Sequence, residues 1–279
     1  MLIKKWEKLP EEFQREEIRP YYEKLRKKNF SLFFKRAFDI FASLILLIIL
    51  SPFFLILAIA IKIDSKGPVF YRQERVTQYG KRFRIHKFRS MVQNADKGSQ
   101  VTVDGDSRVT KVGKFIRKCR LDEISQLIDV LLGDMTFVGT RPEVPKYVDA
   151  YTPEMLATLL LPAGVTSLAS IYYKDEAKLL DGAEDTDKVY TETILPGKMK
   201  YNLRAIENYG FWKDIGVMFM TVFAVLGKDY TDKEQAVEKS EEASEVEETA
   251  TVSEILEQEE VMVEEIAESG EGDEEEDNG

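Results

Sequence analysis

One uninterrupted apolar segment near the start of the chain dominates its hydrophobic pattern. Residues 40–61 are 22 residues without a charged side chain. As a straight α-helix this segment would rise about 33 Å, enough to cross a hydrocarbon core roughly 30 Å thick. Its length predicts a membrane helix, and a simple transmembrane span is the plainest interpretation.

Two features of this segment favour a helix that enters the membrane and returns. Basic residues flank it on both sides, over 24–36 and 62–75, and the positive-inside bias would keep both flanks in the cytoplasm. Pro52 follows Ser51 near the midpoint, where a proline removes a backbone N–H and breaks or kinks a helix. The Ser51 hydroxyl is expected to satisfy a carbonyl that the break frees. We therefore predict a re-entrant helix-break-helix over 37–63, with an ordinary kinked span as the alternative.

The remaining pattern predicts a mainly helical α+β protein. Segment 1–36 mixes aromatic and charged residues and is expected to lie on the membrane surface as amphipathic pieces. Alternating apolar and basic residues predict a small β-hairpin, with strands over 68–76 and 82–89. Apolar residues at three- and four-residue spacing predict a largely helical stretch over 108–130. The polar stretch after Thr166, residues 167–187, is expected to form a loop, and residues 199–226 one or two helices.

Charge divides the chain into two unlike parts. Residues 233–279 contain 20 acidic and two basic side chains, which leaves 37 basic against 30 acidic side chains, a net charge of +7, in residues 1–232. We predict a catalytic domain over 64–229 and a disordered acidic tail over 230–279. A basic body beside a membrane segment fits lipid headgroups or phosphorylated substrates, and no module typical of nucleic-acid binding is present.

Two adjacent carboxylates, Asp122 and Glu123, lie among basic residues, and a glycine-bounded loop that follows them contains Arg141. A carboxylate can bind a metal or attack phosphorus while arginines hold phosphate oxygens. On a helix the two carboxylates would be about 100° apart, close enough to approach one metal. An Asp-Glu pair by itself is usually surface charge. The single cysteine, Cys119, excludes an internal disulfide, and the single histidine, His86, disfavours a histidine-rich metal site.

Taken in order, five motifs resemble the bacterial sugar transferase family, the monotopic polyprenyl-phosphate phosphoglycosyl transferases. The resemblance covers roughly residues 35–226. The matching segments are Lys35–Asp39 ahead of the apolar run with its central Ser51-Pro52, then Gly67–Phe70, Lys87–Met91, Arg120–Leu127 and Gly133–Glu143.

This resemblance implies transfer of a phospho-sugar from a UDP-sugar to polyprenyl (undecaprenyl) phosphate at the cytoplasmic face of the cell membrane, priming polysaccharide or glycoconjugate synthesis. It implies that Asp122 is the nucleophile of a ping-pong reaction with an aspartyl-phosphosugar intermediate. It also implies that Glu123, with Asp122, binds Mg²⁺ and that Arg141 holds phosphate. Further basic candidates are Arg117, Lys87 and Arg89. Membrane lipid is an implied partner, as are other pathway enzymes or a second copy of the chain.

Three positions depart from the family pattern. Thr140 replaces the proline that usually precedes Arg141, Thr77 replaces a frequent glycine, and the segment 162–167 lacks an arginine and a final glycine. The Asp-Glu pair is intact, so we expect an active enzyme. The alternatives are a membrane-associated scaffold or inactive relative that recruits partners through its acidic tail, and a one-span protein with a cytosolic domain.

Overall fold

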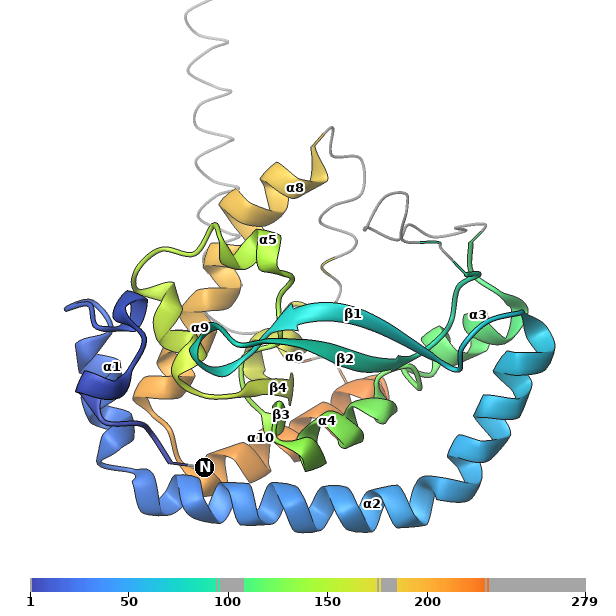
Figure 1. Cartoon of the computed structure of the whole chain (residues 1–279), viewed down its shortest axis with the longest axis horizontal. Helices are drawn as coiled ribbons and strands as arrows, with labels where there is room; N and C mark the ends of the chain where they lie inside the picture. Colours follow the sequence, from blue (N-terminus) through green and yellow to red (C-terminus); the bar gives the residue numbers. More distant parts are fainter. Residues whose placement is uncertain are drawn as a thin grey trace, which may run out of the picture. The chain divides into compact units, whose positions relative to one another are not determined.

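A single 36-residue helix, α2 (Asn29–Asp64), contains the whole apolar segment. In the computed structural model it stays helical through Pro52 and bends along its length (Figure 1). The Ser51 hydroxyl donates a 2.8 Å hydrogen bond to the carbonyl of Ile48, which a backbone N–H at position 52 would otherwise bond. The expected role of Ser51 is confirmed. The expected break is instead a bend within one continuous helix.

The structure describes residues 2–93, 95, 108–174, 176, 185–228 and 230. The predicted acidic tail, apart from Tyr230, lies outside these residues.

The first part of α2 is fixed to the folded body by a buried carboxylate. Asp39 is 1% exposed and accepts a 2.7 Å hydrogen bond from the Thr136 hydroxyl and a 3.3 Å bond from the Phe137 amide. Both partners lie on strand β3 (Met135–Val138). A buried carboxylate needs such partners, because leaving it unpaired in an apolar setting is costly. One face of α2 therefore lies against the body from its early turns.

The far end of α2 is fixed to the same body. Asp64 accepts a 2.9 Å hydrogen bond from the amide of Val112, on helix α3 (Lys111–Lys118). The guanidinium of Arg89 donates to the backbone carbonyls of Ile61, Ser65 and Lys66. Because a helix leaves its last carbonyls without intrahelical partners, Arg89 caps the end of α2.

The N-terminal segment packs into the protein core. Its elements are η1 (Trp6–Lys8), η2 (Glu11–Phe13) and α1 (Arg19–Arg26), and they contact η6 (Met155–Leu160) and α9 (Leu195–Glu207). The side chains of Phe13, Ile18 and Leu25 are fully buried there. The expectation that the apolar side chains of 1–36 lie on a membrane surface is therefore wrong for these residues, because they cover the protein's own core.

The predicted hairpin is confirmed. Strands β1 (Phe70–Val76) and β2 (Arg82–Phe88) pair antiparallel, and η3 (Gln78–Gly80) connects them. A second, parallel pair joins β3 to β4 (Ala163–Thr166), which lies immediately before the stretch expected to be a loop and was not predicted as a strand. Strands of four residues are too short to show a period, so this pair left no sequence signal.

The stretch predicted as one helix is divided in two. Helix α3 ends at Lys118, and η5 (Ile124–Gln126) and α4 (Leu127–Leu132) follow only after a turn. The break occurs because Arg120 adopts a left-handed backbone conformation with φ of 55°, which no helix continues. The predicted C-terminal helices are present as α9 and α10 (Phe211–Val225). The other helical elements are α5 (Pro145–Val148), α6 (Leu168–Tyr172), α8 (Thr186–Val189) and the π-helix η7 (Tyr190–Ile194).

Candidate active site

The carboxylate pair lies in the turn between α3 and η5, not on a helix as the sequence suggested. Strand β2 holds this turn: the amide of Phe88 donates to the carbonyl of Asp122 at 3.1 Å. The fully buried hydroxyl of Ser125 donates to the carbonyls of His86, at 2.9 Å, and Asp122, at 3.3 Å. The backbone of Asp122 is therefore fixed by the hairpin and by its own turn.

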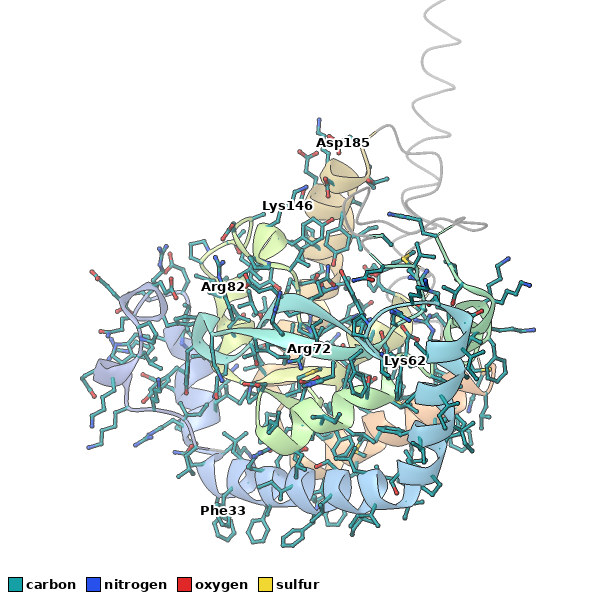
Figure 2. All side chains as sticks on the ribbon, turned by 45° about the vertical axis from the view of Figure 1, so that its right-hand side comes forward. Phe33, Lys62, Arg72, Arg82, Lys146 and Asp185 are labelled. Atoms are coloured by element: carbon teal, nitrogen blue, oxygen red, sulfur yellow. The ribbon has the colours of Figure 1, made fainter. Side chains whose placement is uncertain are left out.

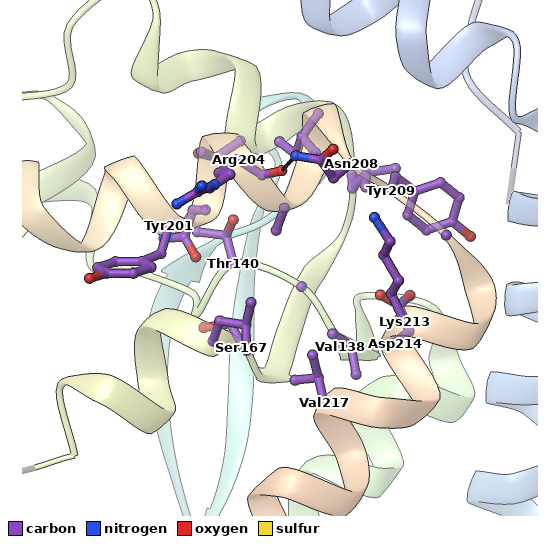
Figure 3. Close-up of a pocket in the computed structure, with 18 of the residues that line it drawn as sticks. Val138, Thr140, Ser167, Tyr201, Arg204, Asn208, Tyr209, Lys213, Asp214 and Val217 are labelled. Atoms are coloured by element: carbon purple, nitrogen blue, oxygen red, sulfur yellow. Dashed lines mark hydrogen bonds between the residues drawn. The ribbon is translucent and has the colours of Figure 1, made fainter. Parts of the chain in front are cut away.

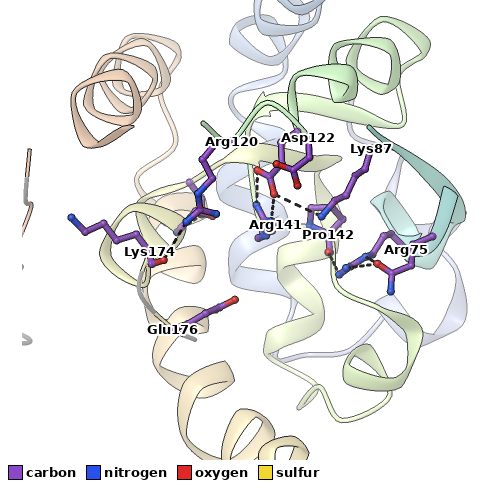
Figure 4. A network of polar contacts seen from close by, with 12 residues as sticks. Arg75, Lys87, Arg120, Asp122, Arg141, Pro142, Lys174 and Glu176 are labelled. Atoms are coloured by element: carbon purple, nitrogen blue, oxygen red, sulfur yellow. Dashed lines mark hydrogen bonds and ion pairs between the residues drawn. The ribbon is translucent and has the colours of Figure 1, made fainter. Parts of the chain in front are cut away.

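Two cations hold Glu123. Arg141 donates to both carboxylate oxygens, one of them at 3.3 Å, and the Lys87 ammonium lies 3.7 Å away (Figure 4). Burial alone would raise the pKa of Glu123, but Arg141 and Lys87 outweigh it and hold that pKa well below its usual value. Arg141 and Lys87 therefore favour the ionised form of Glu123.

Asp122 is in the opposite electrostatic situation. Burial and the neighbouring Glu123 raise its pKa, against a smaller opposing effect of Lys87 and Arg117. Within the described part of the chain, no basic side chain forms an ion pair with Asp122. Glu123 is therefore paired with cations, whereas the Asp122 carboxylate is available to react.

The lowered pKa of Lys87 predicts a pH dependence of activity. Burial lowers its pKa to about 8, with Arg141 and Arg75 adding to the effect and Glu123 opposing it. If the Lys87 ammonium contacts phosphate, kcat/KM should fall about tenfold per unit as the pH rises above about 8. In Lys87→Arg this decline should disappear from the accessible range, because arginine stays protonated.

Stability provides the control for this prediction. The pKa of Lys87 is lower in the folded protein than its unfolded value of about 10.4, so the unfolded state binds more protons between these values. This residue's contribution to stability therefore increases with pH from about 8 to 10, while activity decreases. Lys87 would be excluded as the titrating group if kcat/KM and the melting temperature changed with pH in the same direction. It would also be excluded if the pH dependence of kcat/KM were the same in Lys87→Arg as in the wild type.

The loop that carries Arg141 is held from both sides. Arg75 donates to the carbonyl of Pro142 at 3.0 Å, and the amide of Val76 donates to the carbonyl of Glu143 at 3.0 Å. On the other side Gly164 lies so close that a Cβ atom there would be 2.2 Å from the Gly139 nitrogen. Arg75 was not singled out from the sequence, because alternation in a hairpin does not distinguish one arginine from another.

A buried network lies behind the same loop. Glu143 accepts a 2.7 Å hydrogen bond from the Tyr190 hydroxyl, and Lys198 lies within 3.4 Å of the same oxygen and 3.0 Å from Glu176. Tyr190 begins the π-helix η7, and such turns are frequent at functional sites. These residues are far apart in sequence and carried no local signal.

The structure brings four of the predicted site residues together: Asp122, Glu123, Arg141 and Lys87. Arg117 lies nearby, donates to the Ser90 hydroxyl at 3.0 Å, and helps to lower the pKa of Asp122. The other candidates, which are Arg89 and the pair Ser51 and Pro52, lie outside the site. Arg89 is placed at the end of α2, where the residue is 5% exposed and its guanidinium is bonded to carbonyls, so it is not available to hold phosphate. The remaining pair, Ser51 and Pro52, lies at the bend of α2.

One departure from the family pattern, Thr77, has a local explanation. Thr77 is 2% exposed, and its hydroxyl donates to the carbonyl of Asp134 at 2.6 Å and accepts from the amide of Ala163 at 3.0 Å. The carbonyl of Thr140 accepts a 2.8 Å bond from Gly164. The Thr77 side chain therefore helps to hold β4 beside the site. The Thr140 bond is made by the backbone, which a proline would provide equally, so the structure does not explain that departure.

A cavity of about 570 Å³ extends from this site to the apolar helices. Its lining includes Glu123 and Arg141 together with residues of α2 and α10. The apolar lining includes Leu46, Leu50, Phe137, Met218 and Val225, and the cationic lining includes Lys118, Arg120, Lys174 and Lys198. A ligand with a charged head and a long apolar chain fits these walls.

The outer faces of the same two helices are apolar. Phe33 points away from the body in Figure 2, and it is 54% exposed. Other exposed side chains on these faces are Phe30, Phe41, Ile45, Ile48, Ile49, Ile56, Trp212, Phe219 and Phe223. An apolar surface of this extent marks a membrane or protein contact. Within the described residues α2 is also the one helix long and apolar enough to cross a membrane.

A smaller cavity of about 280 Å³ lies behind the Gly139-Thr140 segment (Figure 3). Its walls come mainly from α9, α10 and the residues around Ser167, and Lys213 extends along one side. Glu123 and Arg141 line the larger cavity and not this one, and Asp122, the neighbour of Glu123, is a lining residue of neither. The larger cavity is therefore the candidate active site.

Magnesium fits the carboxylates only together with substrate. The described residues contain no cluster of three or more metal-binding side chains. Mg²⁺ is commonly bound by one or two carboxylates plus substrate phosphates, and Asp122 and Glu123 supply such a pair. Arg141 and Lys87 already contact the carboxylate oxygens of Glu123, so the carboxylate oxygens of Asp122 are more available to a metal ion.

Comparison with known proteins identifies the family. The family model described as bacterial sugar transferase matches residues 30–228. The chain belongs to the bacterial sugar transferase family. This match contains all of the candidate site residues and both apolar helices.

Curated relatives of the sugar transferase family include three enzymes that act on undecaprenyl phosphate. A UDP-N-acetylgalactosamine-undecaprenyl-phosphate N-acetylgalactosaminephosphotransferase of Aeromonas hydrophila is 37% identical over 198 residues, covering 70% of this chain and 44% of its own. UDP-glucose:undecaprenyl-phosphate glucose-1-phosphate transferases of Klebsiella pneumoniae and Caulobacter vibrioides are 38% and 33% identical over 199 residues each, covering 69% and 70% of this chain and 40% and 70% of their own. The chain thus spans less than half the length of the first two relatives.

Proposed function

We propose that the chain transfers a sugar 1-phosphate from a UDP-sugar to undecaprenyl phosphate. The observation that supports this most directly is the 570 Å³ cavity, which joins a carboxylate-arginine site to the apolar helices α2 and α10. A polyprenyl chain would lie along the apolar lining, and its phosphate would lie among the cationic side chains of the same cavity. The names of the family relatives agree with both substrates.

The reaction would use two displacements at one phosphorus. In the first, a carboxylate oxygen of Asp122 attacks the β-phosphorus of the UDP-sugar, the bond to the bridging oxygen breaks, and uridine monophosphate leaves. In the second, an oxygen of undecaprenyl phosphate attacks the same phosphorus, the bond to Asp122 breaks, and the carboxylate is regenerated. This route splits one difficult displacement into two.

The cations around the carboxylates explain how the charge is managed. Arg141 and Lys87 hold Glu123, and a phosphate that enters the site meets the same two cations. Fixed cations stabilise the charge of the transition state because they need no reorganisation. Mg²⁺ bound at Asp122 or Glu123 would supply further neutralisation of the phosphate oxygens.

We further infer that α2 is re-entrant and that both of its ends lie at the cytoplasmic face. Asp39 and Asp64 join its two ends to one compact unit, Met1–Lys228, which could not lie on both sides of a bilayer. The exposed apolar faces of α2 and α10 would then enter the membrane while the site stays at its surface.

Thiol labelling tests this topology. Lys28 and Lys66 are both exposed, one before the helix and one after it. In a Cys119→Ser background, cysteines placed singly at these positions should react with a membrane-impermeant maleimide in inverted vesicles and not in intact cells. Labelling of the Lys28→Cys variant from outside the cell would show a span instead.

An activity assay separates the enzyme from a scaffold or inactive relative. Purified protein in lipid vesicles, given Mg²⁺, undecaprenyl phosphate and a panel of radiolabelled UDP-sugars, should convert at least one donor into a lipid-soluble product with release of uridine monophosphate. No product from any donor, with the protein folded and membrane-bound, would favour the scaffold.

A further inference from the structure

Arg120 has an unusual backbone conformation immediately before the carboxylate pair. Helix α3 ends in a Schellman motif: the amide of Arg120 bonds to the carbonyl of Arg117 at 3.0 Å, and the amide of Leu121 bonds to the carbonyl of Ile116 at 2.9 Å. Leu121 also packs in one apolar cluster with Ile116. The residue at the left-handed position of this motif is ordinarily glycine.

An arginine at this position is strained, since its φ of 55° brings Cβ close to the backbone. Glycine would form the same cap without strain, because it has no Cβ. The cap therefore gives no reason for the Arg120 side chain. Strained residues of this kind concentrate at functional sites, and the side chain here lines the candidate active-site cavity.

The surroundings of Arg120 fit a phosphate. Its guanidinium donates to the carbonyl of Lys174 at 3.4 Å, a long hydrogen bond, and Figure 4 shows Arg120 between Lys174 and the Arg141 site. Arg120 also helps to lower the pKa of Glu123, so it lies within electrostatic reach of the carboxylates. Lys118 and Lys174 line the same cavity, which gives it a cationic group separate from Arg141 and Lys87.

The chemistry of the proposed reaction defines what this group would bind. In a displacement at phosphorus the attacking and leaving oxygens lie in line, on opposite sides of the phosphorus. Asp122 attacks in the first half-reaction and leaves in the second. The phosphate of departing uridine monophosphate and the phosphate of the incoming lipid must therefore occupy the same place, opposite Asp122.

We propose that Arg120 binds this shared position, holding the α-phosphate of the nucleotide in the first half-reaction and the polyprenyl phosphate in the second. The inference rests on the proposed covalent route. A single residue serves both substrates because the two phosphates bind in turn and never together.

The variant Arg120→Gly distinguishes the contribution of the Arg120 side chain from that of its backbone conformation. Glycine removes the guanidinium and relieves the strained φ, so the melting temperature should stay equal or rise. Both half-reactions should slow by about 10- to 100-fold, as expected for loss of one phosphate-binding group. Lys114→Ala is the matched control, because Lys114 is an exposed cation on the same helix that does not line the cavity.

The two half-reactions are measured separately. The first is the burst of uridine monophosphate released from a UDP-sugar without acceptor, and the second is the transfer of labelled phospho-sugar from isolated modified enzyme to undecaprenyl phosphate. Equal slowing of both steps supports the proposal. The proposal is contradicted if Arg120→Gly slows only one of the two steps or slows neither. It is also contradicted if this variant has a lower melting temperature than the wild type. If the wild-type protein gives no burst with any donor, the covalent route itself fails, and the inference falls with it.

Discussion

Replacing Asp122 by asparagine should reduce sugar-phosphate transfer by roughly 10⁴-fold or more, the scale seen when a catalytic nucleophile is removed. Asparagine has nearly the same shape but cannot form the acyl phosphate. The protein should remain folded and membrane-bound, because the contacts that fix this turn come from the backbone of Asp122 and from Ser125.

The melting temperature of Asp122→Asn should be equal to or slightly above that of the wild type. Burial and Glu123 raise the pKa of Asp122, so its charge is unfavourable in the folded state, and removing it relieves a repulsion. The matched control is Asp129→Asn, which changes a buried carboxylate bonded to His86. Asp129→Asn should have a lower melting temperature but should still release the burst of uridine monophosphate from a UDP-sugar without acceptor. Near-normal turnover in Asp122→Asn would remove Asp122 from the mechanism.

Replacing Arg141 by alanine should lower kcat/KM by about 10²- to 10³-fold, the cost of losing one preorganised donor to developing charge. Arg141→Lys should recover only part of this loss, since lysine keeps the charge but cannot donate two parallel hydrogen bonds. A rate unchanged in both variants would show that Arg141 does not contact the reacting phosphate.

The same substitution should also cost stability. Arg141→Ala leaves the Glu123 carboxylate with Lys87, 3.7 Å away, as its nearest cation. Losing one partner of a buried charge usually costs a few kcal/mol. Because Glu123 retains Lys87 and is partly exposed, we expect about 1–2 kcal/mol, measurable as a lower melting temperature. The double variant Arg141→Ala/Glu123→Gln should regain stability without regaining activity.

The sequence predicted those parts of the fold that repeat a pattern. The apolar run of α2, the alternation of β1 and β2, and the apolar stripes of α9 and α10 each extend over enough residues to show a period. The parallel pair of β3 and β4 is too short for this. The burial of segment 1–36 could not be predicted either, because an amphipathic segment has the same pattern on a membrane and on a protein core.

The site was predictable where it is contiguous in sequence. Asp122 and Glu123 are adjacent, and Arg141 follows in the next loop, so the resemblance to a family was enough to identify them. Lys198, Tyr190 and Arg75 reach the site from distant elements, and only the three-dimensional structure relates them to Glu143 and Pro142. Arg89 shows the opposite case: a basic residue near the motif in sequence is used to cap a helix.

The central claim is that Asp122 carries the phospho-sugar between the two substrates. The most direct test is to incubate the protein with an accepted UDP-sugar and Mg²⁺ without acceptor, digest it under mildly acidic conditions, and map the peptides by mass spectrometry. We predict an added hexose-phosphate mass on the peptide that contains Asp122, lost on addition of undecaprenyl phosphate. Continued formation of lipid product while Asp122 remains unmodified throughout would contradict the account.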